Sequence, residues 1–215
     1  AVFRKGHIVQ PEDIPVLLSI GKEHLYVWEA DESMLHENDA ARILVDLCKS
    51  EGMSESAVKE GKIELAAAVD GLFKVDSKRL QLVNSFGQMM IATRHGNTPV
   101  QKGDKLCGTR IIPLVIEKEK MQRVQELCGA EPLLKLLPYK IKRAAVLATG
   151  SEVFHGRIKD TFTPVIEAKL AEFGVDVIHK EILDDAPEQI TAAIKSAIEE
   201  KGAELVLCTG GMSVD

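Results

Sequence analysis

Two apolar runs in the last third of the chain each stop at a Thr-Gly pair and open into a small, polar loop. The first, AAVLATGSEVFHG, carries Thr149, Gly150 and Ser151, and the second, ELVLCTGGMSVD, carries Thr209, Gly210, Gly211 and Ser213. Glycine permits positive φ and lets backbone N–H groups approach a ligand closely. Threonine and serine add hydroxyl donors. Such loops favour an anionic small molecule.

Carboxylates accompany these loops, at Glu152, Asp160, Asp184, Asp185 and Asp215. Carboxylates beside a phosphate-binding loop are typical of a site for a hard cation such as Mg²⁺, which keeps several waters. Asp185 has Glu188 three residues on, so it reads as a helix N-cap in a capping box, which leaves Asp184 to face the site.

Each of these features also has a purely structural reading. A glycine after a strand is often only a turn, and Glu152 reads equally well as a solvated loop residue. His155 and His179 read as ordinary polar residues on a loop and a strand. It is the position of three such loops on one edge of the sheet that indicates a site.

Several other chemistries are not indicated. The phosphate-binding pattern G-x-x-x-x-G-K-[ST] and the dinucleotide pattern G-x-G-x-x-G are absent, and spacing supports no Ser-His-Asp or Cys-His nucleophile. The four cysteines never form a C-x-x-C pair, so they read as core thiols in a reducing compartment: Cys48, Cys107, Cys128 and Cys208.

The elements that must position the loops follow from apolar periodicity. Strands are expected over 141–149, 175–183 and 203–209, with helices over 161–174 and 184–202 between them. This β-α-β-α-β order predicts a three-layer α/β domain, in which a parallel sheet with right-handed connections lies between helices. Ligands of such sheets bind beyond the carboxyl ends of the strands, where all three loops lie.

The first 140 residues lack this alternation and predict an α+β domain. Helices are expected within 39–52, 76–87 and 117–129, and strand-like runs within 24–30, 88–95 and 105–116. The proline-bearing stretch GAEPLLKLLPYK is the natural boundary, which gives domains at 1–140 and 141–215.

Composition bounds the class of protein. There are 215 residues, with 33 acidic against 27 basic side chains and a net charge of −6, which argues against a nucleic-acid partner. No run approaches the ~20 apolar residues of a membrane span, and nothing resembles a signal peptide. We therefore expect a cytoplasmic protein with a small-molecule ligand.

The chain lacks an initiator Met and ends on Asp215. We expect an excised fragment in which strand 203–209 lacks cover on one face, so that either residues missing from this chain cover it or the fragment dimerises; a homo-oligomer is therefore expected.

The three loops together resemble the molybdopterin-binding domain of the MoaB, MogA, MoeA and gephyrin proteins. The pattern T-G-x-E…G-x-I-x-D, a strand ending in D-D, and T-G-G-x-S spans roughly residues 143–215. The stretch FRKGHIVQPEDIPVLLSIGKEHLYV is similar to a short MoeA segment that runs almost directly into the binding domain. Here about 110 residues intervene, so the chain resembles a divergent MoeA-like branch.

The resemblance implies roles for individual residues. Asp184 matches the acidic residue that the family uses in catalysis. A second family aspartate would lie beyond residue 215, so we expect the site to be incomplete and the chain inactive as an insertase. The implied binding residues are Thr149, Gly150, Ser151, Glu152, Asp160, Thr209, Gly210, Gly211 and Ser213.

The implied function is that of a MoeA-like protein of molybdenum cofactor biosynthesis. It would bind molybdopterin, or its adenylylated form, and assist the insertion of molybdate with Mg²⁺, by positioning and electrostatics. Two alternatives stay open: a non-catalytic pterin-binding carrier or sensor, and a different nucleotide-binding α/β domain. Release of AMP on addition of molybdate separates the first two, and ligand choice separates the third.

Overall fold

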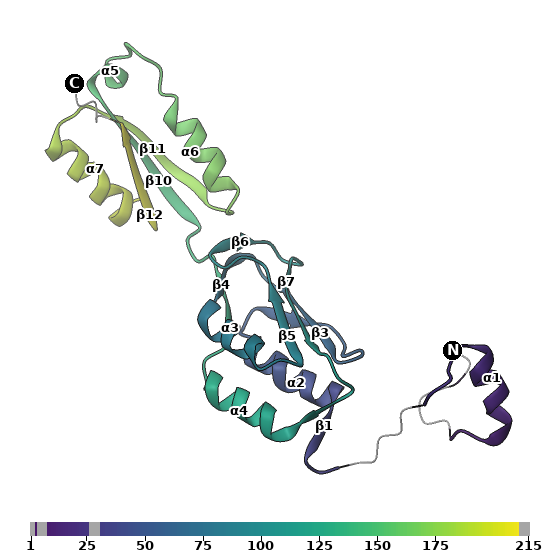
Figure 1. Ribbon diagram of the computed structural model, residues 1–215. Helices are drawn as coiled ribbons and strands as arrows, with labels where there is room; N and C mark the ends of the chain where they lie inside the picture. Colours follow the sequence, from purple (N-terminus) through teal and green to yellow (C-terminus); the bar gives the residue numbers. More distant parts are fainter. Residues whose placement is uncertain (1–2, 4–7, 26–30, 211–215) are drawn as a thin grey trace.

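The computed structural model describes residues 3, 8–25 and 31–210 of the chain. Residues 8–25 contain a 3-10 helix, η1 (Pro11–Asp13), followed directly by the short helix α1 (Ile14–Ser19). The other described residues form a part rich in antiparallel strands and a part built on a parallel sheet (Figure 1). No described helix is long and apolar enough to cross a membrane.

The expected helices of the first part are present, and side chains cap two of them. The ring of His36 accepts a hydrogen bond from the Asn38 N–H at 3.2 Å, and the carboxylate of Asp76 accepts one from the Arg79 N–H at 3.1 Å. Such caps satisfy N–H groups that have no partner within the helix. The three helices are α2 (Glu37–Cys48), α3 (Ser77–Ser85) and α4 (Lys118–Cys128).

The strands of this part form three small sheets. One has the order β2-β3-β7-β5, a second has the order β6-β4-β9, and β1 pairs with β8; every pairing is antiparallel. The strands are β1 (Met34–His36), β2 (Met53–Glu55), β3 (Lys62–Ala67), β4 (Gly71–Val75), β5 (Met89–Thr93), β6 (Thr98–Val100), β7 (Lys105–Ile111), β8 (Val115–Glu117) and β9 (Leu134–Pro138).

Two of the expected strand-like runs contain such strands: 88–95 holds β5, and 105–116 holds β7 and the start of β8. The third run, 24–30, is different. Residues 24–25 are not in a strand, and 26–30 lie outside the described residues.

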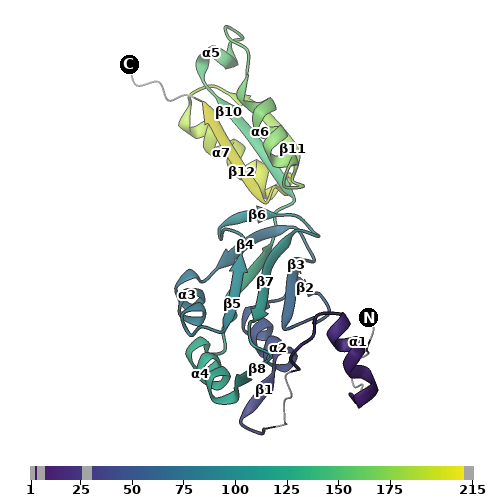
Figure 2. The same ribbon diagram turned by 45° about the vertical axis from the view of Figure 1, so that its right-hand side comes forward.

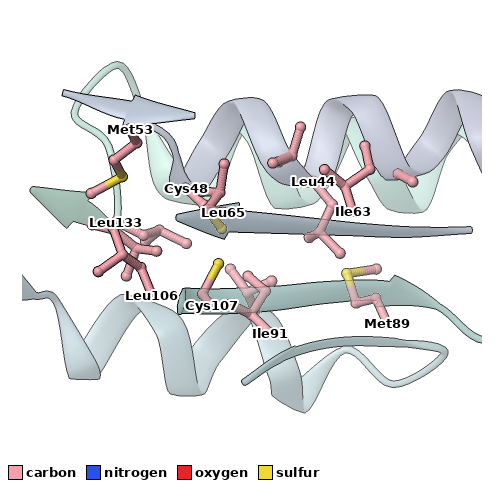
Figure 3. Close-up of a cluster of buried hydrophobic side chains, with 14 of the residues drawn as sticks. Leu44, Cys48, Met53, Ile63, Leu65, Met89, Ile91, Leu106, Cys107 and Leu133 are labelled. Carbon is pink, nitrogen blue, oxygen red and sulfur yellow. The ribbon is translucent and has the colours of Figure 1, made fainter. Parts of the chain in front are cut away.

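Helices and sheets of the first part share one large apolar core. Phe73, Leu44 and Leu65 are fully buried in it, and Figure 3 shows the last two. Figure 3 also shows Cys48 of α2 and Cys107 of β7 pointing their sulfur atoms toward each other. A hydrogen bond to Cys107, together with burial, raises the pKa of the Cys48 thiol well above its usual value. The Cys48 thiol therefore serves as a packing group.

The second part is the predicted parallel α/β domain. Its sheet has the order β11-β10-β12, and both strand pairings are parallel. The central strand is the most apolar, since Ala144 to Ala148 are all buried, as expected for a strand covered on both faces. The elements are β10 (Arg143–Thr149), α5 (Ser151–Phe154), α6 (Phe162–Ala171), β11 (Asp176–Leu183), α7 (Pro187–Glu199) and β12 (Leu205–Gly210).

Strand order explains why the domain has three layers. The connection from β10 to β11 moves one strand to one side, and the connection from β11 to β12 crosses back over β10. Two right-handed crossovers of opposite direction place their helices on opposite faces of the sheet. Figure 1 shows α6 and α7 flanking the sheet in this way.

One sequence expectation about the cysteines is wrong. Cys48, Cys107 and Cys128 are buried, but Cys208 on β12 is exposed. β12 lies at the end of the described sheet, and its side chains are at most half-buried, so a thiol there is not a core group.

Between the two parts, β9 ends at Pro138 and β10 begins at Arg143. Strand β9 pairs antiparallel with β4, whereas β10 pairs parallel with β11 and β12. We propose that the domain boundary lies in this connection, near residue 140.

Candidate functional site

Two of the predicted loops, and the Thr209-Gly210 start of the third, meet at the carboxyl edge of the parallel sheet. In the strand register Thr149 stands opposite Leu183 on one side and opposite Gly210 on the other, so all three strands end at one level. The register therefore brings the Thr-Gly loop after β10 beside the Asp-Asp loop after β11 and the end of β12.

Ser151 connects the first two loops. Its hydroxyl donates to Oδ1 of Asp184, and its backbone N–H donates to Oδ2 of Asp185 at 3.2 Å. The N–H of Asp185 donates to the same Asp184 oxygen at 2.9 Å. Two successive aspartates thus hold one serine.

These contacts set the protonation state of Asp184. The Ser151 hydroxyl, then the Asp185 N–H, and then the nearby charge of His155 lower the pKa of the Asp184 carboxyl. Hydrogen bonds to a carboxylate favour its charged form. Asp184 is therefore an ionised acceptor at neutral pH.

The expectation that Asp185 caps the second helix is wrong. Helix α7 begins at Pro187, its N-cap is Ala186, and no side chain caps it. Proline at the first helical position has no N–H to satisfy and a φ already suited to the helix, so the start needs less help from a side chain. The Asp185 carboxylate instead accepts from Ser151.

Asp160, a predicted binding residue, lies just before the N-cap Thr161 of α6 and accepts hydrogen bonds from the first backbone N–H groups of that helix. Its Oδ1 accepts from the N–H of Phe162 at 2.9 Å and from that of Thr163 at 3.1 Å, at the start of α6. The Thr163 hydroxyl and these N–H groups lower the pKa of Asp160. These hydrogen bonds of the Asp160 carboxylate all serve the start of α6, so a role in binding stays a prediction.

Glycines close the edge between β10 and β12. Gly210 has φ of +107°, and a Cβ there would lie 2.0 Å from the backbone oxygen of Thr149. Gly150 has φ of +140°, and its N–H donates to the Leu183 oxygen at 3.1 Å, which extends the parallel ladder by one bond. Glycine is needed at position 210 for the backbones to pack and at position 150 for its positive φ, before any ligand is considered.

The remaining predicted residues are placed less tightly. Glu152 is exposed on α5, while Thr149 and Thr209 are half-buried at the strand ends. Gly211 and Ser213 lie outside the described residues, as does Asp215. Among the residues that are described, no group of three His, Cys, Asp or Glu side chains could hold a metal ion.

His155, expected from the sequence to be an ordinary polar loop residue, lies beside Ser151 and Asp184. Its Nδ1 lies 2.8 Å from the backbone oxygen of Ser151, and its ring meets that of Phe154 edge-on at 5.3 Å. Residues four apart face each other on a helical turn, and that spacing from Ser151 is the signal that could have identified it.

Comparisons with known proteins agree on the second part of the chain. Residues 145–215 match a family model described as "Probable molybdopterin binding domain", and residues 1–29 match one described as a domain of unknown function. A CinA-like protein of Mycobacterium avium is 36% identical over 70 residues, and one of Mycobacterium tuberculosis is 37% identical over the same length. Each alignment covers 33% of this chain and 16% of the relative.

Two solved structures are similar over about the same stretch. The molybdopterin biosynthesis enzyme MoaB of Thermus thermophilus is 25% identical, with a TM-score of 0.33, over 35% of this chain and 47% of that one. The protein CinA of Thermoplasma acidophilum, titled as of unknown function, is 27% identical, with a TM-score of 0.32, over 34% and 42%.

The family match begins inside β10 and takes in all three loops of the carboxyl edge. It coincides with the stretch that carries the Thr-Gly and Asp-Asp patterns. Residues 145–215 match the model of a probable molybdopterin-binding domain, and the carboxyl edge of β11-β10-β12 is the candidate site of this stretch.

Proposed function

We propose that this edge binds the phosphate-bearing end of molybdopterin, or of its adenylylated form, and that the chain acts in molybdenum cofactor biosynthesis. The supporting observation is the junction at Ser151, where Asp184 and Asp185 draw two loops together in a segment that matches a molybdopterin-binding family. A preformed polar edge of this kind suits a small anionic ligand.

The proposed binding residues divide by chemistry. The hydroxyls of Thr149, Ser151 and Thr209 would donate to phosphate oxygens, and the glycines would keep side chains out of the ligand's path. Glu152, Asp160 and Ser213 complete the proposed set on the strength of the family pattern alone. Preorganised donors of this kind lower the cost of holding an anion.

Mg²⁺ fits this edge only with help from the ligand. Asp184 and Asp185 supply two carboxylates beside Ser151, and the described residues offer no third ligand there. Mg²⁺ commonly takes one or two carboxylates and completes its octahedron with waters and substrate phosphates. We therefore propose that Asp184 and Asp185 hold Mg²⁺ jointly with the phosphate of the bound pterin.

The finer proposal is a MoeA-like insertase that transfers molybdate, the co-substrate, to the bound pterin, with Asp184 as its catalytic carboxylate. We further propose a cytoplasmic homo-oligomer. Phe162 and Val165 of α6 are 58% and 59% exposed, and neighbouring apolar side chains of this kind favour association.

Turnover and binding test these proposals separately. The whole protein, with any residues that follow Asp215, is mixed with adenylylated molybdopterin, Mg²⁺ and molybdate, and AMP release is followed beside calorimetric binding of molybdopterin. Ser151→Ala should weaken binding, because it removes the hydroxyl that faces Asp184. Asp46→Asn, on the exposed face of α2, is the matched control.

The outcomes distinguish the candidate functions. AMP release that requires molybdate supports the insertase. Tight binding of the pterin without AMP release would instead favour a carrier or sensor. Binding of AMP or ATP alone, with no affinity for molybdopterin, would contradict the proposal and favour a nucleotide-binding domain.

A further inference from the structure

A cavity of about 670 Å³ lies at the end of the parallel sheet opposite to the Thr-Gly loops. Its walls are the turn between β3 and β4, β6 with the turn after it, the connection into β10, and the turn between α6 and β11. Figures 1 and 2 both show β6 facing the parallel sheet where the two parts join. β10 spans seven residues, so at ~3.3 Å per residue the cavity and the loops lie about 20 Å apart.

Two aromatic rings, one from the connection and one from the α/β domain, form part of the lining. Tyr139 and Phe173 meet edge-to-face, with ring centroids 5.4 Å apart and planes at 87°. Phe173 is 40% exposed and lines the cavity, so part of its ring is open to a ligand. Asp70 lines the same cavity as this ring pair, and burial, then the Asp70 carboxylate, raises the pKa of the Tyr139 phenol.

The charges of the lining do not cancel. Asp104 is paired with Arg94 at 2.7 Å, so its charge is compensated. Asp70 accepts only the backbone N–H of Lys102, at 2.6 Å, and in the described part of the chain neither Asp70 nor Glu172 forms an ion pair. Against these two carboxylates the lining offers one lysine, Lys142. The cavity therefore has an excess of negative charge beside aromatic rings.

We propose that this cavity binds a small organic cation carried on a planar aromatic ring. The ring of the ligand packs against the Tyr139–Phe173 pair, and its cationic group lies near Asp70 and Glu172. Cations are attracted both to carboxylates and to aromatic faces, and stacking adds to apolar burial. The volume falls within the ~300–1,000 Å³ of small-molecule pockets, which favour domain junctions.

Three isosteric probes test the charge preference: benzamidinium, benzamide and benzoate. Each is titrated into the whole protein by calorimetry and by protein-observed NMR. We expect benzamidinium to bind, benzamide to bind about tenfold more weakly, and benzoate not to bind, since a tenfold change corresponds to one modest charge interaction. Benzoate binding as tightly as benzamidinium would overturn the proposal.

Variants locate the site. Asp70→Asn and Phe173→Ala should each weaken benzamidinium binding by about tenfold, whereas Asp46→Asn on distant α2 should leave it unchanged. Glu172→Gln, at an exposed turn, serves as a second carboxylate variant if Asp70→Asn disturbs the fold. Equal affinity in all four variants would place the probe elsewhere and refute the assignment. Because no step involves the Thr-Gly loops, the result is independent of pterin binding.

Discussion

Asp184 and Asp185 are adjacent in sequence but hold different atoms of Ser151, one the hydroxyl and the other the backbone N–H. The sequence predicts that Asp184 is functional and that Asp185 caps the next helix. In the structure both carboxylates instead accept hydrogen bonds from Ser151 in the first loop. The reason is Pro187, which starts the helix without a side-chain cap and leaves Asp185 to turn toward Ser151.

The pKa of Asp184 allows a prediction about pH. Its folded-state pKa lies below the ordinary value of 3.8, so its contacts with Ser151 are present above that value and are lost as the pH falls through the lower folded pKa. Molybdopterin affinity should therefore show no titration of Asp184 between about pH 5 and 8. Calorimetry of wild type and Asp184→Asn across this range checks it. A step near neutral pH in wild type that Asp184→Asn abolishes would contradict it.

Replacing Asp160 and Asp185 in turn tests which of the two aspartates stabilises the start of the helix that follows it. Asp160→Ala removes the acceptor for two N–H groups at the start of α6 and should lower the free energy of unfolding by about 1 kcal/mol. Asp185→Ala removes no cap and should change it by less than half as much. Urea unfolding of both variants measures the difference. The reverse order would restore Asp185 as the helix cap.

At the scale of elements, a strand can be predicted from sequence when the residue pattern that specifies it lies within the strand itself. β10 is readable because Ala144 to Ala148 form an unbroken apolar run, which only a strand buried on both faces requires. The loop positions follow from strand order alone. The antiparallel sheets are harder to read, because the pairing of β4 with β9 joins residues about 60 positions apart and depends on tertiary packing.

The candidate site was only partly readable for a related reason. The sequence shows which glycines and aspartates are present. Whether a carboxylate faces a ligand, a helix or a serine depends on the direction of the backbone, which the sequence does not show. Asp160 and Asp185 differ in this respect although both precede a helix. The contact between Gly210 and Thr149 is equally invisible in sequence, since it exists only when β12 pairs with β10.

That contact predicts unequal effects of two glycine substitutions. Gly210→Ala would put a Cβ 2.0 Å from the Thr149 oxygen, which forces the ends of β10 and β12 apart. Gly156→Ala also has positive φ, +70°, but meets nothing within 4 Å, so it should cost only the backbone strain of about 1 kcal/mol. Urea unfolding followed by circular dichroism should show a clearly larger loss for Gly210→Ala. Equal losses would mean that the two strand ends can separate freely.

At the scale of the whole molecule, the described residues hold their buried apolar side chains in separate clusters. One large cluster joins α2, α3 and α4 to the antiparallel sheets, and two small ones lie between α7 and the parallel sheet. No buried cluster spans the connection at 139–142. Segments that share no core generally open independently, which is the physical content of the proposed boundary near residue 140.

Two core leucines, one in each part, test whether the parts are independent. Leu44 of α2 and Leu147 of β10 are both fully buried, so replacing either with Ala should cost about 2–5 kcal/mol locally. Hydrogen exchange followed by mass spectrometry should show faster exchange in α2, β3 and β7 for Leu44→Ala, with the parallel sheet unchanged. Leu147→Ala should accelerate exchange in β10, β11 and β12 and leave the antiparallel sheets protected. If either variant accelerates exchange equally in both parts, the chain unfolds as one cooperative unit and the boundary is not one of folding.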